Sequence, residues 1–157
     1  PLSAPENIDR VVRPLLENAI ESTVTLRILI KSCEELMDRN VTKVVVDNSN
    51  SALYFSKAPI PWDRDKWGGD SIEYSSFDPL KSFWYKHIGL YAYRKKFLMG
   101  FGSLPDSGLE KIEKLEQLRI LEGGFKIKVV ETNIDSIGVD CEADLAIIEK
   151  HLAAVLP

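Results

Sequence analysis

The chain has 157 residues, a net charge of −4 and 45% hydrophobic residues, which is enough for one domain with a core of its own. The mildly acidic balance, without a basic block, argues against a general nucleic-acid surface and against an anionic-membrane surface. No apolar run is long enough to cross a membrane and no signal peptide opens the chain, so we expect a soluble, cytoplasmic protein. The two cysteines have neither disulfide-framework nor metal-ligand spacing, and we expect both to be free thiols, Cys33 and Cys141.

The first 56 residues mix helix and strand. Pro5 suits the first turn of a helix whose apolar residues recur at helical spacing. Runs of β-branched residues predict strands, and the last two runs flank the turn residues Asn48–Asn50, which predicts a hairpin. The expected elements are a helix from residue 5 to about 18–21, a strand at 24–30, a short helix at 32–38, and strands at 43–47 and 52–56.

An irregular, proline-rich stretch follows the hairpin, from Pro59 to Pro79. Two cations, Lys57 and Arg64, follow the end of the strand in the proline-stiffened segment 56–65, and fixed cations of this kind suit a carboxylate or a phosphate. The alternative is a solvated loop with local Asp–Arg pairs. Its many aromatic residues argue against plain solvent exposure and could cover a ligand or a partner subunit.

The stretch Lys86–Arg94 alternates with period two, which predicts a strand. One face is apolar and should pack against helices (Ile88, Leu90 and Ala92). The other face carries an imidazole and two phenols around a glycine (His87, Gly89, Tyr91 and Tyr93). The missing side chain of the glycine leaves room for a molecule to lie against the sheet. The plainer alternatives are a strand with one solvated face and a structural, hydrogen-bonded histidine.

One helix is predicted over Ser107–Glu122. Ser107 and Glu110 have capping-box spacing, and Gly123 and Gly124 suit the C-cap. At about 100° per residue, the apolar residues form one broad stripe (Leu109, Ile112, Leu115 and Leu118).

Two charged residues, Glu116 and Arg119, fall inside that predicted stripe. A charge on a buried face is costly unless it is paired, and residues three apart can pair with each other. The alternative is a carboxylate held by its arginine and presented to a ligand. Gln117 lies at the margin of the stripe, where it could contact the same ligand or simply face solvent.

The remaining elements are a strand at 125–130, a turn at 137–140 and a last helix at 142–152. Asp140 is either an N-cap or a magnesium ligand that needs a second carboxylate from elsewhere. Strands and helices together predict an α/β fold with a mixed sheet. No glycine-rich nucleotide loop is present, so either the protein binds no nucleotide by itself or the half that does so is missing.

Several segments, in order, resemble the 3-deoxy-manno-octulosonate (KDO) cytidylyltransferases, or CMP-KDO synthetases. They are ALYFSKAPIPWDRD, HIGLYAYR, GLEKIEKLEQLRILEGGFKIKVVE and GVDCEADL, and the opening PLSAPENI resembles the residues directly after that family's GDE motif. The chain lacks the family's basic, glycine-containing CTP loop and the GDE aspartate. Lys57 stands where the family usually shows Arg, and Cys141 where Thr commonly caps the helix.

The resemblance implies a nucleotidyltransferase fold that is glycosyltransferase-A-like and Rossmann-like and incomplete at its N-terminus. Residues 1–157 would be the sugar-acid-binding and dimerisation portion of a single domain. The implied reaction is attack of the anomeric hydroxyl of KDO on the α-phosphorus of CTP, giving CMP-KDO and pyrophosphate for lipopolysaccharide synthesis. The family is typically a cytoplasmic homodimer, and the implied partners are CTP and KDO, with no nucleic acid and no membrane insertion.

The same resemblance implies roles for seven residues. Sugar hydroxyls would be held by His87, Tyr91, Glu116 and Gln117, the sugar carboxylate would face Arg64 and Lys57, and Asp140 would bind Mg²⁺. No residue of this chain is assigned a catalytic role with certainty, and we expect no CTP turnover by the chain alone. The alternatives are a cytidylyltransferase for a sialic-acid-like or 8-amino sugar acid, and a non-catalytic dimerising fragment.

Overall fold

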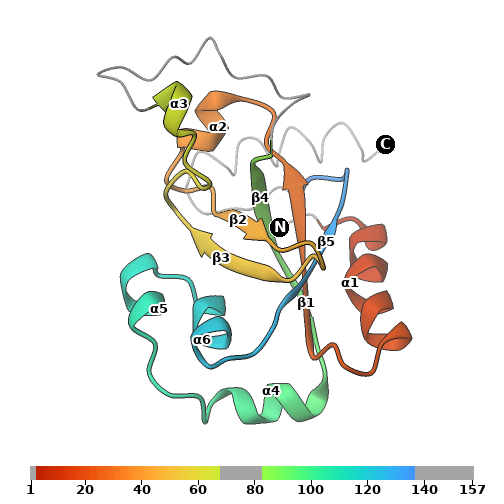
Figure 1. Cartoon of the computed structure of the whole chain (residues 1–157). Coiled ribbons are helices and arrows are strands. Elements are labelled where there is room, and N and C mark those ends of the chain that lie inside the picture. Colours follow the sequence, from red (N-terminus) through yellow and green to blue (C-terminus); the bar gives the residue numbers. More distant parts are fainter. Residues whose placement is uncertain (1–2, 68–82, 137–157) are drawn as a thin grey trace, which may run out of the picture.

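The computed structural model describes residues 3–67 and 83–136 (Figure 1). Its centre is a five-stranded sheet in the order β3-β2-β4-β1-β5. β4 is antiparallel to both of its neighbours, β1 and β2, whereas β1 and β5 are parallel. The predicted α/β class with a mixed sheet is therefore confirmed. The strands are β1 (Thr23–Leu29), β2 (Lys43–Val46), β3 (Ala52–Ser56), β4 (Tyr85–Tyr93) and β5 (Lys128–Glu131).

Helices lie at both sides of this sheet, with α1 beside β1 and β5, α5 and α6 on the side of β3, and α4 at the lower end of β4 (Figure 1). The first helix begins at the predicted proline, and Ser32 caps the second by accepting a hydrogen bond from the Glu35 N–H. The predicted hairpin forms between β2 and β3. The helices are α1 (Pro5–Glu17), α2 (Cys33–Met37), α3 (Arg64–Trp67), α4 (Lys95–Phe101), α5 (Gly108–Glu113) and α6 (Gln117–Glu122).

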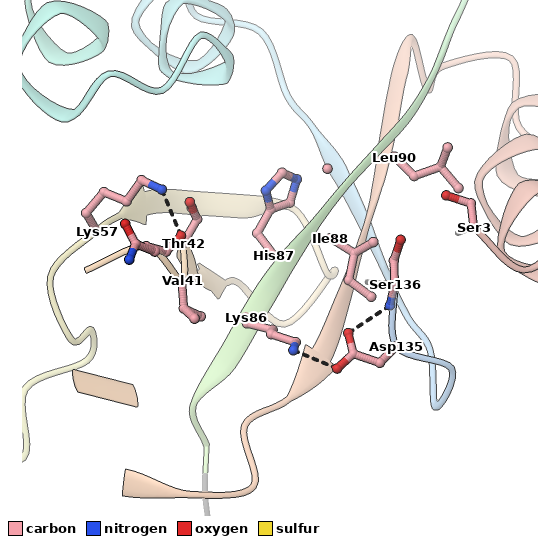
Figure 2. Close-up of a pocket in the computed structure, with 12 residues that line it drawn as sticks. Ser3, Val41, Thr42, Lys57, Lys86, His87, Ile88, Leu90, Asp135 and Ser136 are labelled. Carbon is pink, nitrogen blue, oxygen red and sulfur yellow. Dashed lines mark hydrogen bonds and ion pairs between the residues drawn. The ribbon is translucent and has the colours of Figure 1, made fainter. Parts of the chain in front are cut away.

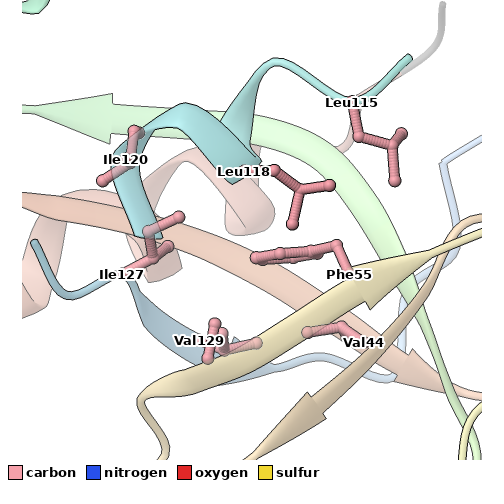
Figure 3. Packing of buried hydrophobic residues seen from close by; sticks show 8 residues of the cluster. Val44, Phe55, Leu115, Leu118, Ile120, Ile127 and Val129 are labelled. Carbon is pink, nitrogen blue, oxygen red and sulfur yellow. The ribbon is translucent and has the colours of Figure 1, made fainter. Parts of the chain in front are cut away.

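The two faces of β4 differ as its alternation predicted. Ile88, Leu90 and Ala92 pack with Val11 and Leu15 of α1 in one apolar cluster. On the other side of the sheet, Phe55 joins a second cluster that binds α6 and β5 to the hairpin (Figure 3). The second face of β4 carries the side chains of His87, Tyr91 and Tyr93, and it lies beside this cluster.

The predicted single helix over Ser107–Glu122 is wrong, because the chain turns at Lys114 into two short helices. Lys114 adopts a left-handed conformation (φ 57°) and its N–H donates to the Glu110 carbonyl. The turn lets Leu115 and Leu118 reach the Phe55 cluster, while Ile112 is left 81% exposed. The predicted caps are confirmed: the Ser107 hydroxyl accepts from the Glu110 N–H, and Gly123 follows α6 as its C-cap.

Two of the aromatic residues in and after this loop are core residues, which agrees with the prediction that they are not plainly solvent-exposed; whether the loop covers a ligand or a partner stays a prediction. Trp67 and Trp84 stack at 4.9 Å between ring centroids and are buried with Ile30 and Leu36. Trp84 also donates its indole N–H to the Pro61 carbonyl at 2.7 Å. Residues 68–82, the turn at 137–140, Asp140 and the last predicted helix lie outside the described residues.

Candidate functional site

A cavity of about 420 Å³ lies beside β4, at the end of its pairing with β2 (Figure 2). The two strands pair only through Tyr85 and Lys86, and one further bond joins the His87 N–H to the Thr42 carbonyl. From Gly89 onward this edge of β4 has no strand neighbour within the described ranges. Lining residues that bear on its chemistry are Asn40, Lys57, Lys86, His87, Gly89 and Asp135.

His87 is held on two sides at the wall of this cavity. Its Nε2 atom lies 2.9 Å from the Thr25 hydroxyl, and its ring meets Phe55 edge-on at 5.0 Å. Burial, aided by the nearby charge of Lys57, lowers the pKa of His87 to about 3. The imidazole is therefore neutral at physiological pH, and its hydrogen bond to Thr25 is what the structural alternative for this histidine expects, while its contact with a ligand stays a prediction.

Tyr91 stands next to His87, with 5.3 Å between the ring centroids, and stacks on Tyr93 at 5.6 Å. Its hydroxyl is buried and has no hydrogen-bond partner in the part of the chain that the structure describes. Burial raises the pKa of Tyr91 well above the ordinary value, although the nearby Thr25 hydroxyl acts in the opposite sense, so the phenol stays protonated. A buried hydroxyl without a partner is uncommon in proteins. Tyr91 is not among the residues that line the cavity, and its contact with the site is through the His87 ring.

Lys57 reaches the cavity from the end of β3. Its ammonium donates to the Asn40 carbonyl at 2.9 Å (Figure 2). Its own N–H donates to the Glu113 carboxylate at 3.0 Å, and the same carboxylate accepts from the Ser56 hydroxyl at 2.6 Å. The backbone at Lys57 is thus fixed while one cation remains at the cavity.

Lys43, on β2, fixes the same region from inside the protein. Its side chain is fully buried, and its ammonium donates to the carbonyls of Asp38, Val41 and Lys57 at 2.7–2.9 Å. Burial lowers the pKa of Lys43. Sequence reasoning missed Lys43 and Glu113 as supports of the site. The available signal was a lysine that opens an otherwise apolar run, KVVV.

Lys86 is a second cation at the cavity that sequence reasoning missed. Its ammonium forms an ion pair with Glu35 at 2.6 Å and another with Asp135 at 2.7 Å, the second of which is drawn in Figure 2. Although burial opposes the charged form, these two partners leave the pKa of Lys86 raised. Two carboxylates therefore neutralise Lys86, whereas among the residues that the structure describes the Lys57 ammonium bonds a carbonyl and no carboxylate.

The other predicted site residues are not gathered at the cavity. Arg64 lies on α3 with 91% of its side chain exposed, 3.9 Å from the Asp65 carboxylate. Glu116 is exposed at the start of α6, and Gln117 beside it is buried. The expected Glu116–Arg119 pair is wrong, because the turn at Lys114 brings Arg119 to Glu110 instead.

The described residues do not provide a metal site. No group of three or more His, Cys, Asp or Glu side chains among them could hold a metal ion. Asp140, the predicted magnesium ligand, lies outside them, so its role stays a prediction. No described helix is long and apolar enough to span a membrane.

The mixed sheet with helices at both sides is an α/β architecture, and comparison with known proteins places it among the nucleotidyltransferases. The solved structure of CMP:2-keto-3-deoxy-manno-octonic acid synthetase complexed with CTP superposes with a TM-score of 0.82 at 30% identity, covering 98% of this chain and 58% of that one. A profile of the family described as cytidylyltransferase matches residues 1–128. The chain belongs to this cytidylyltransferase family.

Two similar relatives are both named 3-deoxy-manno-octulosonate cytidylyltransferase. The protein of Pelobacter propionicus is 45% identical over 155 residues, which cover 99% of this chain and 60% of the relative. The protein of Geobacter metallireducens is 46% identical over 151 residues, which cover 96% of this chain and 59% of the relative. The chain therefore spans about 60% of the length of these relatives.

Proposed function

We propose that the protein containing this chain transfers CMP from CTP to KDO, giving CMP-KDO and pyrophosphate. The observation that carries the proposal is one cavity wall that holds the neutral imidazole of His87 and the Lys57 ammonium, with the Tyr91 phenol packed against that imidazole. The likeness to relatives named for KDO supports the choice of substrate.

The chemistry of the cavity suits a sugar acid. A neutral imidazole and a phenol exchange hydrogen bonds with hydroxyl groups, and a fixed ammonium attracts a carboxylate. Gly89 leaves the wall open, since a Cβ placed there would meet nothing within 4 Å. In the reaction these groups bind and orient the sugar acid, which makes attack by its hydroxyl on the nucleotide effectively unimolecular.

Glu116 and Gln117 remain proposed contacts to the sugar hydroxyls, and Arg64 a proposed contact to the carboxylate. Burial raises the pKa of Tyr93, and the negative charge of Glu116 raises it further. Glu116 therefore lies close enough to β4 to influence the tyrosine face of that strand. Arg64 has the weakest support of the predicted site residues, since its side chain is almost fully exposed and does not line the cavity.

We further propose that Mg²⁺ accompanies the nucleotide and that Asp140 is this chain's contribution to its binding. Magnesium would neutralise phosphate charge during the transfer. The cytoplasm, lipopolysaccharide synthesis and a homodimer are proposed on the same grounds, namely the resemblance to the KDO enzymes.

The test is a product assay with the whole polypeptide that contains this chain, supplied with CTP, Mg²⁺ and one sugar acid at a time. Products are identified by mass spectrometry for KDO, 8-amino-KDO and a sialic acid. The proposal predicts CMP-KDO, with KDO giving the highest kcat/KM, and no turnover by residues 1–157 alone. A higher kcat/KM for another sugar acid would make that acid the substrate, and no product with any of them would leave a non-catalytic protein.

A further inference from the structure

Thr25 is a buried hydroxyl at an irregularity of the sheet. It lies on β1 with no exposed surface, where the register between β1 and β4 shifts between Thr25 and Leu26. Its Oγ1 atom lies 2.9 Å from the Leu90 carbonyl oxygen, 3.2 Å from the Ile88 carbonyl oxygen and 2.9 Å from Nε2 of His87. One hydroxyl therefore meets three possible partners.

The number of protons decides how these three contacts are made. The Thr25 hydroxyl carries one proton, and the two carbonyls can only accept. If that proton pointed to His87, two carbonyl oxygens would face the Thr25 oxygen with no hydrogen between them. Pointing the proton to one carbonyl leaves one such oxygen–oxygen contact instead of two, so this arrangement is favoured; the Thr25 oxygen then accepts from His87, whose Nε2 carries the hydrogen.

We infer that Thr25 is a positioning residue that holds the imidazole of His87 in its Nε2–H tautomer and leaves Nδ1 as a bare acceptor for the ligand of the cavity. Within residues 3–67 and 83–136, no group hydrogen-bonds to Nδ1, and His87 lines the cavity (Figure 2). Burial keeps the ring neutral, as its pKa of about 3 indicates, so a protonated Nδ1 does not compete at neutral pH.

A bare Nδ1 selects a hydrogen-bond donor. This step rests on the proposed function, in which the ligand is a sugar acid that carries several hydroxyl groups. A hydroxyl donates to Nδ1, whereas a group that can only accept is repelled by its lone pair. The inference thus assigns the orientation of one sugar hydroxyl, with its proton toward His87.

The tautomer is measured directly by long-range ¹H–¹⁵N correlation spectra of the histidine rings, in the intact protein at neutral pH without ligand. His87→Gln assigns the signal of His87 by its loss from the spectrum, whichever other histidines the intact protein carries. The inference predicts a protonated Nε2 and a bare Nδ1 in the wild type. A protonated Nδ1 would overturn it, and this result requires no variant to fold.

Three variants separate the hydroxyl of Thr25 from the packing around it. Thr25→Val removes the acceptor of the Nε2–H and is expected to give a mixture of tautomers, whereas Thr25→Ser keeps the wild-type spectrum. The matched control is Thr23→Val, because Thr23 is equally buried on β1 and its hydroxyl has no partner among the described residues. An unchanged tautomer in Thr25→Val, or the same change in Thr23→Val, contradicts the inference.

Kinetics of the intact protein test the consequence for the ligand. Thr25→Val is expected to raise the KM for KDO about tenfold, the effect of about one hydrogen bond, with the KM for CTP unchanged. An unchanged KM for KDO would contradict the assigned role of Nδ1. A wild type that fails to use KDO would reject the proposed function and leave the measured tautomer as it is, so the two failures are distinguishable.

Discussion

Arg119 donates two hydrogen bonds to the Glu110 carboxylate, from Nε at 2.6 Å and from a terminal nitrogen at 2.8 Å. The two residues lie on α6 and α5, on opposite sides of the left-handed Lys114. A second carboxylate, Glu122, accepts from the Ser107 hydroxyl at 2.5 Å and so joins the start of α5 to the end of α6. Two side-chain contacts therefore hold the helices together across the turn between them.

The turn between α5 and α6 predicts opposite outcomes for two apolar residues that a continuous helix would place on one stripe. Leu118→Ala is expected to lower the free energy of unfolding by about 2–5 kcal/mol, because Leu118 is fully buried against the Phe55 cluster. Ile112→Ala should change it by no more than about 0.5 kcal/mol, because Ile112 is exposed. Denaturant unfolding measures both, and similar losses in the two variants would argue for one continuous helix.

The buried ammonium of Lys43 predicts a large loss of stability when it is removed. Lys43→Met leaves the carbonyls of Asp38, Val41 and Lys57 without a donor, which should cost about 3 kcal/mol or more. Lys95→Met is the matched control, since Lys95 is exposed and should change the unfolding free energy by less than about 0.5 kcal/mol. Equal unfolding free energies in the two variants would contradict a supporting role for Lys43.

His87 predicts a dependence of stability on pH. Its pKa is about 3 in the folded protein and near 6.5 when unfolded, so the unfolded chain binds more protons between these values. The unfolding free energy should therefore rise with pH across this window, and the contribution of His87 is lost as pH falls from about 6.5 toward 3. The expected slope is at most about 1.4 kcal/mol per pH unit.

The contribution of His87 to the pH dependence of the unfolding free energy is isolated by comparing the wild type with His87→Gln in denaturant unfolding at pH 7, 6 and 5. The difference in unfolding free energy between the two proteins should shrink as the pH falls, since only the wild type must keep this ring neutral. The Lys57 charge near the ring contributes to its lowered pKa, so Lys57→Met should raise the low-pH end of the window and leave the slope between pH 7 and 5 nearly unchanged. A pH-independent difference between wild type and His87→Gln would show that His87 titrates alike in both states.

Substitutions of Gly89 are expected to affect ligand binding without affecting stability. A Cβ at this position meets no atom within 4 Å, so Gly89→Ala should leave the unfolding midpoint close to that of the wild type. Gly89→Leu places a larger group at the cavity wall and should raise the KM for the sugar acid roughly tenfold or more, a loss of about 1.4 kcal/mol. Gly100→Leu is the control, because Gly100 also has open space but lies on α4, away from this cavity. Equal KM values for the two leucine variants would exclude the cavity as the sugar site.

Local signals in the sequence predict the structure correctly where a single element decides the outcome. The period-two alternation of β4, the proline that begins α1 and the glycine after α6 all depend on residues next to one another. The break at Lys114 carries no such signal, since lysine is an ordinary helix residue and the leucine spacing fits one helix equally well. The turn is explained by the burial of Leu115 and Leu118 against Phe55. Phe55 is far away in the sequence, so local spacing does not predict this contact.

The site was predicted in part for the same reason. His87 and Tyr91 share one strand face, so their proximity follows from alternation alone. Thr25 and Glu113 support the site from distant parts of the chain, and no spacing rule joins them to His87 or Lys57. The Glu110–Arg119 fork likewise depends on a turn that the sequence does not mark.

The most direct test of the sugar-acid site is a titration of the intact protein with KDO, followed at the ring nitrogens of His87 by NMR. The account predicts a saturable shift of the Nδ1 resonance, because a sugar hydroxyl donates to it, and no such saturation in Gly89→Leu over the same range of KDO. A resonance that does not move while KDO is turned over would place the sugar elsewhere and contradict the assignment of this cavity.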